Sequence, residues 1–362
     1  MKSVIQKPVI KERYLWVDLI RVIATFAVVA IHVNADFICS WNKIPWVDWW
    51  VSDIYSAVTH FAVPVFIILS GYLLLDKQED DWVFFSKRFD KVVIPLVAWS
   101  MIYWIVVNNY NVFSVFTIGF VRQFLADTIY YHLYFLYIII GLYIFTPLLR
   151  RILANAKMHD IYYFLILWFL FTPFRQLIGL FGYNFEIPLE ATTGYLGYYI
   201  TGYAIKKTPI TDKIIYLSGI MAVTSIIGTI VGSYILSINS GRFESFFISG
   251  LSITTVVYSI CLFIFLRKVL DHMIVSTAIM KIKNIISNVA VASMGIYLIH
   301  PILLLYVSNG LFGAFLLPAS FPTPKVLSPI IYVPLVTVLL VVVSLIIVII
   351  MQKIPLIKKI VP

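Results

Sequence analysis

Residues 14–35 read YLWVDLIRVIATFAVVAIHVNA, an apolar run that contains three ionisable side chains, Asp18, Arg21 and His32. About 20 consecutive apolar residues in a helix are enough to cross the hydrocarbon core of a membrane, which is about 30 Å thick. The run therefore predicts a membrane-spanning helix. Because it carries charged residues and lacks a small-residue cleavage site, we expect it to be retained and not removed as a signal peptide.

The same pattern recurs along the whole chain. Hydrophobic residues make up 61% of the 362 positions and charged residues 12%, about half the charged share of an ordinary soluble domain. Apolar runs separated by charged breaks predict ten spans, at residues 14–35, 54–75, 91–109, 129–149, 161–181, 191–206, 214–236, 246–267, 286–308 and 327–351. We therefore expect an all-α integral membrane protein, a polytopic bundle of about ten transmembrane helices in one domain over residues 1–362. The composition argues against a soluble all-α protein.

The positive charge of the chain is concentrated in short loops between these spans. A formal net charge of +10 would suggest a nucleic-acid partner for a soluble protein. If the N-terminus is cytoplasmic, however, 21 of the 27 lysines and arginines lie on the inner side, five lie on the outer side and Arg21 lies within a span. Because basic loops stay on the cytoplasmic side of a membrane, we expect both termini in the cytoplasm and no nucleic-acid partner.

The first span holds the sharpest group of polar residues. An ionisable side chain within a bilayer is costly unless it is paired or hydrated, so each one is a functional candidate. Asp18 and Arg21 are three residues apart and can pair. Arg21 and His32 are eleven apart, which places them on one stripe of the helix about 16 Å apart along its axis. The alternative is a structural ion pair and a hydrogen-bonded core histidine, and the residues alone leave both interpretations open.

Four histidines are expected at a similar depth in four spans. His60 lies in the second span, His132 near the start of the fourth and His300 in the ninth, in the same outer half as His32 in the first. No HExxH or Cys/His spacing accompanies them, so we expect no metal site. Because histidines on apolar faces are more often structural, we expect one or two of these four to be catalytic.

A basic cluster lies at the inner end of the second and third spans. The second span ends with Ser70-Gly71-Tyr72, and Lys87-Arg88-Phe89-Asp90-Lys91 follows a short acidic loop. Basic residues beside a glycine break suit an anionic phosphate ligand, and the Arg88 guanidinium matches phosphate oxygens in bidentate fashion. For the lysines, anchoring of the cytoplasmic side is the alternative explanation.

Four motifs in order resemble the acyltransferase-3 family of membrane O-acyltransferases, which includes enzymes that acetylate bacterial surface polysaccharides. They are Arg21 with His32 after ten intervening residues, Ser70-Gly71-Tyr72-Leu73, Tyr131-His132-Leu133-Tyr134-Phe135, and Ser293-Met294-Gly295-Ile296-Tyr297 with His300. The resemblance runs from about Tyr14 to Pro301, and the chain looks closest to the shorter single-domain members. One departure is that many members have Arg-x-x-Arg where this chain has Arg88 and Lys91, and lysine keeps the charge but not the planar fork.

The resemblance implies an acyl-CoA donor, most often acetyl-CoA, and a glycan or lipid-linked sugar as acceptor, in a multi-pass protein of the bacterial cytoplasmic membrane. On that basis His32 is expected to act as general base on an acceptor hydroxyl. Arg21 would orient the acyl-CoA and Asp18 would hold Arg21, while a covalent acyl-histidine stays open as a variant.

The remaining expected site residues divide between donor and acceptor. Arg88 and Lys91 would hold donor phosphates, with Ser70 and Tyr72 beside them. His132, His300 and Tyr297 would position the acceptor. No metal is expected.

Two other classes of protein remain as alternatives. A secondary transporter or lipid-linked sugar flippase explains ten helices and buried polar residues equally well, but not the Arg21–His32 spacing together with the basic inner motif. Such a protein would move its substrate with no acyl-CoA present. A sensory or structural membrane component would tolerate replacement of His32 without loss of any reaction product.

Overall fold

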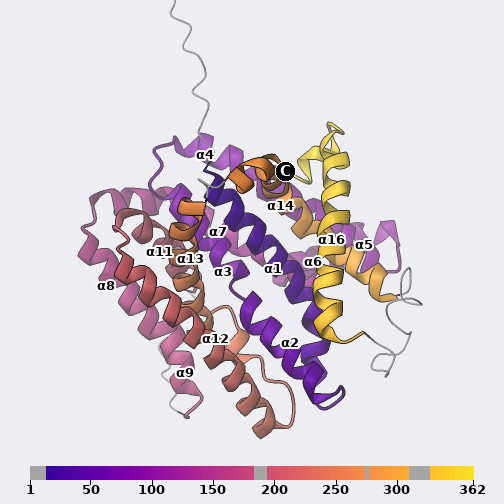
Figure 1. Ribbon diagram of the computed structural model, residues 1–362. Helices are drawn as coiled ribbons and strands as arrows, with labels where there is room; N and C mark the ends of the chain where they lie inside the picture. The colour runs from indigo at the N-terminus through magenta and orange to yellow at the C-terminus, as the bar shows by residue number, and fades with distance from the viewer. Residues whose placement is uncertain (1–13, 183–193, 274–276, 310–326) are drawn as a thin grey trace, which may run out of the picture.

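The computed structural model describes residues 14–182, 194–273, 277–309 and 327–362, and over these residues every regular element is helical. Nine helical stretches in this part of the chain are long and apolar enough to cross a membrane. They are built from α1 (Leu15–Cys39), α2 (Trp46–Thr59) with α3 (Ala62–Leu74), α4 (Asp81–Arg88) with α5 (Ile94–Val107), α7 (Tyr134–Asn155), α8 (Met158–Phe169) with α9 (Arg175–Gly179), α12 (Asp212–Ser240), α13 (Ile253–Met273), α14 (Thr277–Asn309) and α16 (Pro329–Gln352). The prediction of an all-α polytopic membrane bundle is confirmed (Figure 1).

The expected sixth span corresponds to α11 (Leu196–Lys207), which is only 12 residues long. Its residues from Gly197 to Ala204 are all buried, although it is too short to meet the length of a spanning helix. The first residues of the predicted span, 191–193, lie outside the described residues, as do most of the expected outer segments 182–190 and 309–326.

Three of the spans are interrupted, one by a break between two helices and two by π-helical turns. The second divides at His60 and Phe61, between α2 and α3, and a π-helical turn, Phe89–Val93, joins α4 to α5 just before Pro95. A second π-helical turn, Leu170–Phe174, contains Pro173. Proline lacks the N–H that would continue the helical ladder. The expected glycine break at Gly71 is wrong, because α3 continues through Gly71 to Leu74.

Gly71 instead allows α3 and α11 to pack with their backbones in contact. A Cβ at Gly71 would lie 1.8 Å from the carbonyl oxygen of Tyr199, and a Cβ at Gly202 would lie 2.0 Å from that of Ile68. Backbone atoms cannot move aside as a side-chain tip can, so both positions exclude any larger residue. Small residues at such crossings are the usual means of close helix association in membranes.

We expect Gly71→Ala to destabilise the protein by roughly 3 kcal/mol or more, because overpacking against a fixed backbone oxygen forces the two helices apart. Gly141→Ala is the matched control, since a Cβ at Gly141 meets nothing within 4 Å and alanine is the better helix former. The melting temperature of each purified variant in detergent measures the difference. Equal melting of Gly71→Ala and the wild type would contradict this packing.

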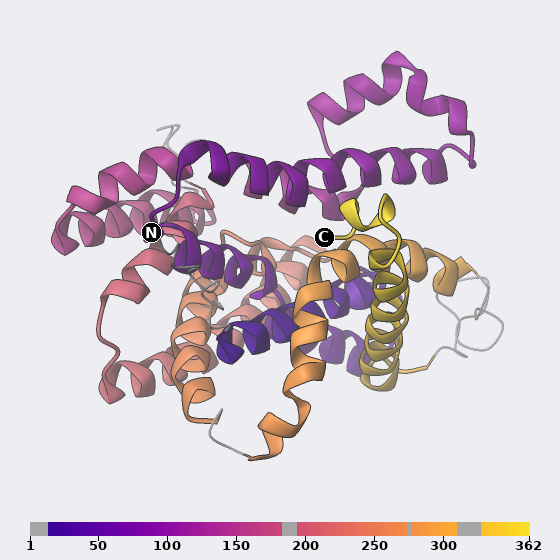
Figure 2. The same cartoon turned by 90° about the horizontal axis from the view of Figure 1, so that it is seen from above.

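The first helix runs through the middle of the bundle and contacts α2, α3, α13, α14 and α16. Two contacts show that α1 and α14 are parallel neighbours: Ser287 meets Asp18, and further toward the C-terminus of both helices His300 meets His32. Seen from above, α16 also lies beside α14 (Figure 2). Residues far apart in the sequence therefore reach the same level of the bundle.

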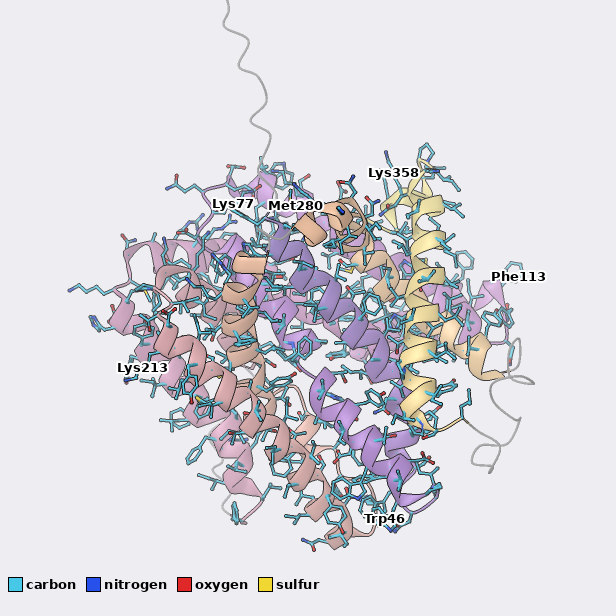
Figure 3. The ribbon with its side chains drawn as sticks, in the orientation of Figure 1. Trp46, Lys77, Phe113, Lys213, Met280 and Lys358 are labelled. Atoms are coloured by element: carbon cyan, nitrogen blue, oxygen red, sulfur yellow. The ribbon has the colours of Figure 1, made fainter. Side chains whose placement is uncertain are left out.

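The labelled residues of Figure 3 distinguish the two ends of the bundle. Lys77 and Lys358 lie toward the same end, Trp46 lies at the other, and Lys213 lies along the side (Figure 3). We call these the basic end and the opposite end. Which end faces the cytoplasm stays a prediction.

Candidate active site

Three histidines converge in the half of the bundle away from the basic end. His32 comes from α1, His132 from the 3-10 turn Tyr131–Leu133 that leads into α7, and His300 from α14. The ring centroids of His32 and His300 are 5.2 Å apart, and the two ring planes are inclined by 28°. The ring centroids of His132 and His300 are 6.0 Å apart. His132 and His300 are fully buried, and His32 is partly exposed. We call these three residues the histidine cluster.

Tyrosines hold the histidine cluster in place. Tyr297 donates its hydroxyl to the backbone carbonyl of His132, with the two rings 5.3 Å apart. Tyr103 of α5 lies 4.8 Å from the His132 ring and donates to the carbonyl of Leu298 at 2.7 Å. Tyr131 lies 4.9 Å from His32. Tyr103 was not expected in the site, because one tyrosine among 23 carries no spacing signal.

The hydrogen bonds leave imidazole nitrogens free for other partners. His300 Nδ1 lies 3.1 Å from the carbonyl of Ile296, so Nδ1 carries the proton and Nε2 presents a lone pair. Over the described residues, His300 Nε2 and both nitrogens of His132 have no hydrogen-bond partner. Buried polar atoms are normally satisfied, so these nitrogens indicate a site built to meet a polar ligand.

A cavity of about 280 Å³ opens beside the histidine cluster, and His32 lines it together with Asp36, Tyr130, Tyr131 and Tyr332. We call it the aromatic pocket. Aromatic faces and hydroxyl groups suit the apolar faces and hydroxyls of a sugar ring. His60, which was expected at the same depth, lies at the α2–α3 break with its Nδ1 2.7 Å from the carbonyl of Ser56.

A second cavity, of about 500 Å³, lies at the basic end. It is lined by the basic residues Arg21, Lys77, Lys87, Arg88 and Lys91, by the polar residues Ser70 and Tyr143, and by Leu73, Leu74 and Val92. We call it the basic pocket. Four of the residues expected around the donor, namely Arg21, Ser70, Arg88 and Lys91, are thus brought together from three separate helical segments.

One carboxylate lies against the cations of the basic pocket. Glu79 Oε1 is 2.6 Å from Lys77 Nζ and 2.7 Å from Lys87 Nζ, and its Oε2 is 3.3 Å from an Arg88 nitrogen. Burial alone would raise the pKa of Glu79, but the hydrogen bonds from both lysines and the charge of Arg88 outweigh it and lower the pKa to about 2. Glu79 is therefore ionised at neutral pH.

A fourth cation, Arg150, lies 3.8 Å from Glu79 Oε2. Four residues at or beside this pocket were not expected from the sequence: Glu79, Lys77, Tyr143 and Arg150. Glu79 and Lys77 lie in the loop before Lys87 and Arg88, so an acid between basic residues was a usable signal. Tyr143 and Arg150 come from a distant helix, and no local pattern indicates them.

Two expected site residues are not among those that line the basic pocket. Tyr72 projects from another face of α3, where its ring meets the Trp16 ring edge-on at 5.2 Å and its hydroxyl accepts a bond from Arg267 Nε at 3.4 Å. Successive helix residues are rotated by about 100°, so Tyr72 cannot share the face of Ser70. Asp18 accepts a hydrogen bond from Ser287 Oγ at 2.8 Å and so ties α1 to α14.

One helix, α1, contributes a residue to each of the two pockets. Arg21 lines the basic pocket and His32 lines the aromatic pocket, about 16 Å apart on the axis of α1. Over the described residues, no group of three or more His, Cys, Asp or Glu side chains is placed to hold a metal ion.

The bundle, with ionisable side chains inside it and a cavity at each end of its central helix, defines a polytopic all-α membrane protein with an internal polar site. The chain belongs to the acyltransferase-3 family, because the family model of this acyltransferase domain matches residues 14–349. It is therefore a membrane acyltransferase. Comparison with curated proteins and with solved structures gives no match.

Proposed function

We propose that the protein transfers an acyl group, acetyl in the first instance, from cytoplasmic acyl-CoA to a hydroxyl of a cell-surface glycan or lipid-linked sugar. The observation that supports this most is that α1 carries Arg21 into the basic pocket and His32 into the aromatic pocket. One helix thereby links a site for an anionic donor to a site with a base. The protein would act in the bacterial cytoplasmic membrane, with its basic end facing the cytoplasm.

The basic pocket supports binding of the donor. CoA carries its negative charge on phosphate groups at one end and its thioester at the other end of a flexible arm. Arg88 and Lys91 would hold the phosphates, and Arg21 would guide the arm into the bundle. Ser70 lines the same pocket. The thioester would then extend along α1 toward the histidine cluster.

His32 is the histidine best placed to act as the base. It lines the aromatic pocket, whereas His132 and His300 are fully buried behind it. His32 would take the proton of the acceptor hydroxyl as its oxygen attacks the thioester carbonyl. The new C–O bond forms, the C–S bond breaks, and the proton passes from His32 to the departing thiolate to give free CoA.

His132, His300 and Tyr297 would position the acceptor and the His32 ring. The stacking of His300 on His32 restricts that ring's orientation. A covalent acyl-histidine, formed when His32 itself attacks the thioester, is the variant of the same chemistry. No metal is assigned a role.

The proposal is tested with purified protein in nanodiscs, radiolabelled acetyl-CoA and a lipid-linked glycan extract. We expect release of free CoA that depends on the extract, and label in the glycan fraction. Succinyl-CoA in a parallel assay tests the size of the acyl group. Movement of glycan lipid across the bilayer without acyl-CoA, and no CoA release with either donor, would contradict the proposal and favour a flippase.

A further inference from the structure

An acid, Glu79, lies against three of the cations that line the basic pocket, although it is not itself part of the lining. The Glu79 side chain is only 5% exposed and lies within 4 Å of four cationic side chains, those of Lys77, Lys87, Arg88 and Arg150. An anion at this position occupies the charges that an anionic ligand would need. Two roles are conceivable for such a carboxylate: it can organise the cations, or it can compete with the ligand.

Both arginines have contacts other than those with Glu79 that hold their side chains. The guanidinium carbons of Arg88 and Arg150 lie 4.3 Å and 4.6 Å from the centre of the Phe84 ring, which is fully buried. Such cation–π contacts fix the planes of both groups. Arg150 Nε also donates to the carbonyl of Leu74 at 2.9 Å. These contacts would remain for both cations if Glu79 moved away.

The site also has more donors than a carboxylate satisfies. Arg150 is only 10% exposed, yet its two terminal nitrogens have no hydrogen-bond acceptor among the described residues. A carboxylate offers two oxygens, which already face Lys77, Lys87 and Arg88. A phosphate group offers a third oxygen and more charge, and it matches the fork of an arginine.

We propose that Lys77, Lys87, Arg88 and Arg150 form a subsite for a phosphate group of the acyl-CoA donor, and that Glu79 occupies it until the donor displaces the carboxylate. This inference rests on the proposed function. Glu79 lies in the short loop between α3 and α4, so its release requires movement of that loop and not of a membrane helix. Glu79 thereby weakens binding of the donor. The apparent Kd equals the intrinsic Kd divided by the fraction of molecules whose subsite is open.

The test is binding of CoA to the purified full-length protein in phosphatidylcholine nanodiscs, measured by calorimetry. If Glu79 fills the subsite nine-tenths of the time, Glu79→Gln lowers the Kd for CoA by about tenfold. Asp76→Asn is the matched control, because it removes the same charge from the same loop while its partners are Lys206 and Lys207. We expect its Kd to stay within about twofold of the wild-type value.

A second measurement covers the case in which Glu79→Gln does not fold. Hydrogen exchange of the 75–80 loop in the wild-type protein is expected to become faster when CoA binds, since the loop loses its anchor. Unchanged or weaker CoA binding by folded Glu79→Gln, or slower exchange of the loop, would overturn the competitor role and leave the proposed function intact. Absence of CoA binding by both wild type and variant would overturn the proposed function as well.

Discussion

Replacement of His32 with alanine is expected to lower the rate of acyl transfer by about 10²–10⁴-fold, the range ascribed to a general base, while CoA binding stays unchanged. His32 lines the aromatic pocket, whereas the basic pocket and its cations lie at the other end of α1. Loss of the imidazole therefore removes the proton acceptor without touching the donor site. The measurement is the initial rate of label transfer from acetyl-CoA, together with CoA binding to the same preparation.

His159→Ala is the matched control for this substitution. The His159 side chain is 73% exposed and pairs only with its neighbour Asp160 in the described structure, so its removal should leave transfer unchanged. A folded His32→Ala protein that transfers at the wild-type rate would contradict the assignment. His300→Ala or His132→Ala causing a larger loss than His32→Ala would move the base to that residue.

The same variants separate the two chemical routes. A covalent acyl-histidine would appear as acyl label retained on wild-type protein when acceptor is withheld, and as its absence in His32→Ala. Direct transfer leaves no label on either protein. The transfer rates show whether His32 is required, and the label shows whether a His32 nitrogen or the acceptor oxygen attacks the thioester.

Replacement of Arg88 with alanine is expected to weaken binding of acyl-CoA by about 10- to 100-fold, with a much smaller effect on the rate at saturating donor. Hydrogen bonds to charged groups contribute about 1.5–3 kcal/mol, and Arg88 lies in the wall of the basic pocket. Arg88→Lys should recover part of the affinity, because it keeps the charge but loses the bidentate fork. The measurements are the Kd for CoA and the dependence of rate on donor concentration.

Arg151→Ala provides the control for Arg88. Arg151 is 69% exposed, and its partner is Asp81, outside the lining of the basic pocket. We expect its CoA affinity to match that of the wild type. Equal losses in Arg88→Ala and Arg151→Ala would mean that the end of the bundle attracts CoA through its general positive charge alone, without a defined site.

The membrane bundle was predictable from the sequence because hydrophobic length is a local property. A run such as residues 14–35 is long enough to span a membrane whatever its neighbours are. The relation between Arg21 and His32 was predictable for the same reason, since helical periodicity places residues eleven apart on one stripe. The family motifs predicted that this membrane bundle is an acyltransferase, and the match of the family model over residues 14–349 confirms the family.

Some local expectations were corrected by contacts between helices. Gly71 was expected to break a helix, whereas the backbone of α11 lies against it and α3 continues. Tyr72 was grouped with Ser70 because the two are close in sequence, but it faces Trp16 and Arg267. In both cases the neighbouring residue comes from another helix, which no pattern within the motif reveals.

By itself, the sequence determined that the chain lies in a lipid bilayer, where its helices run, how basic residues are distributed among the loops, and that polar residues form a stripe along α1. Only the tertiary structure decided that His300 meets both His32 and His132, and that Glu79 and Arg150 meet beside cations of the basic pocket. The physical reason is that periodicity reports the face on which a side chain lies. Which faces meet depends on the packing of helices against one another, through close approaches such as that of Gly71 to Tyr199.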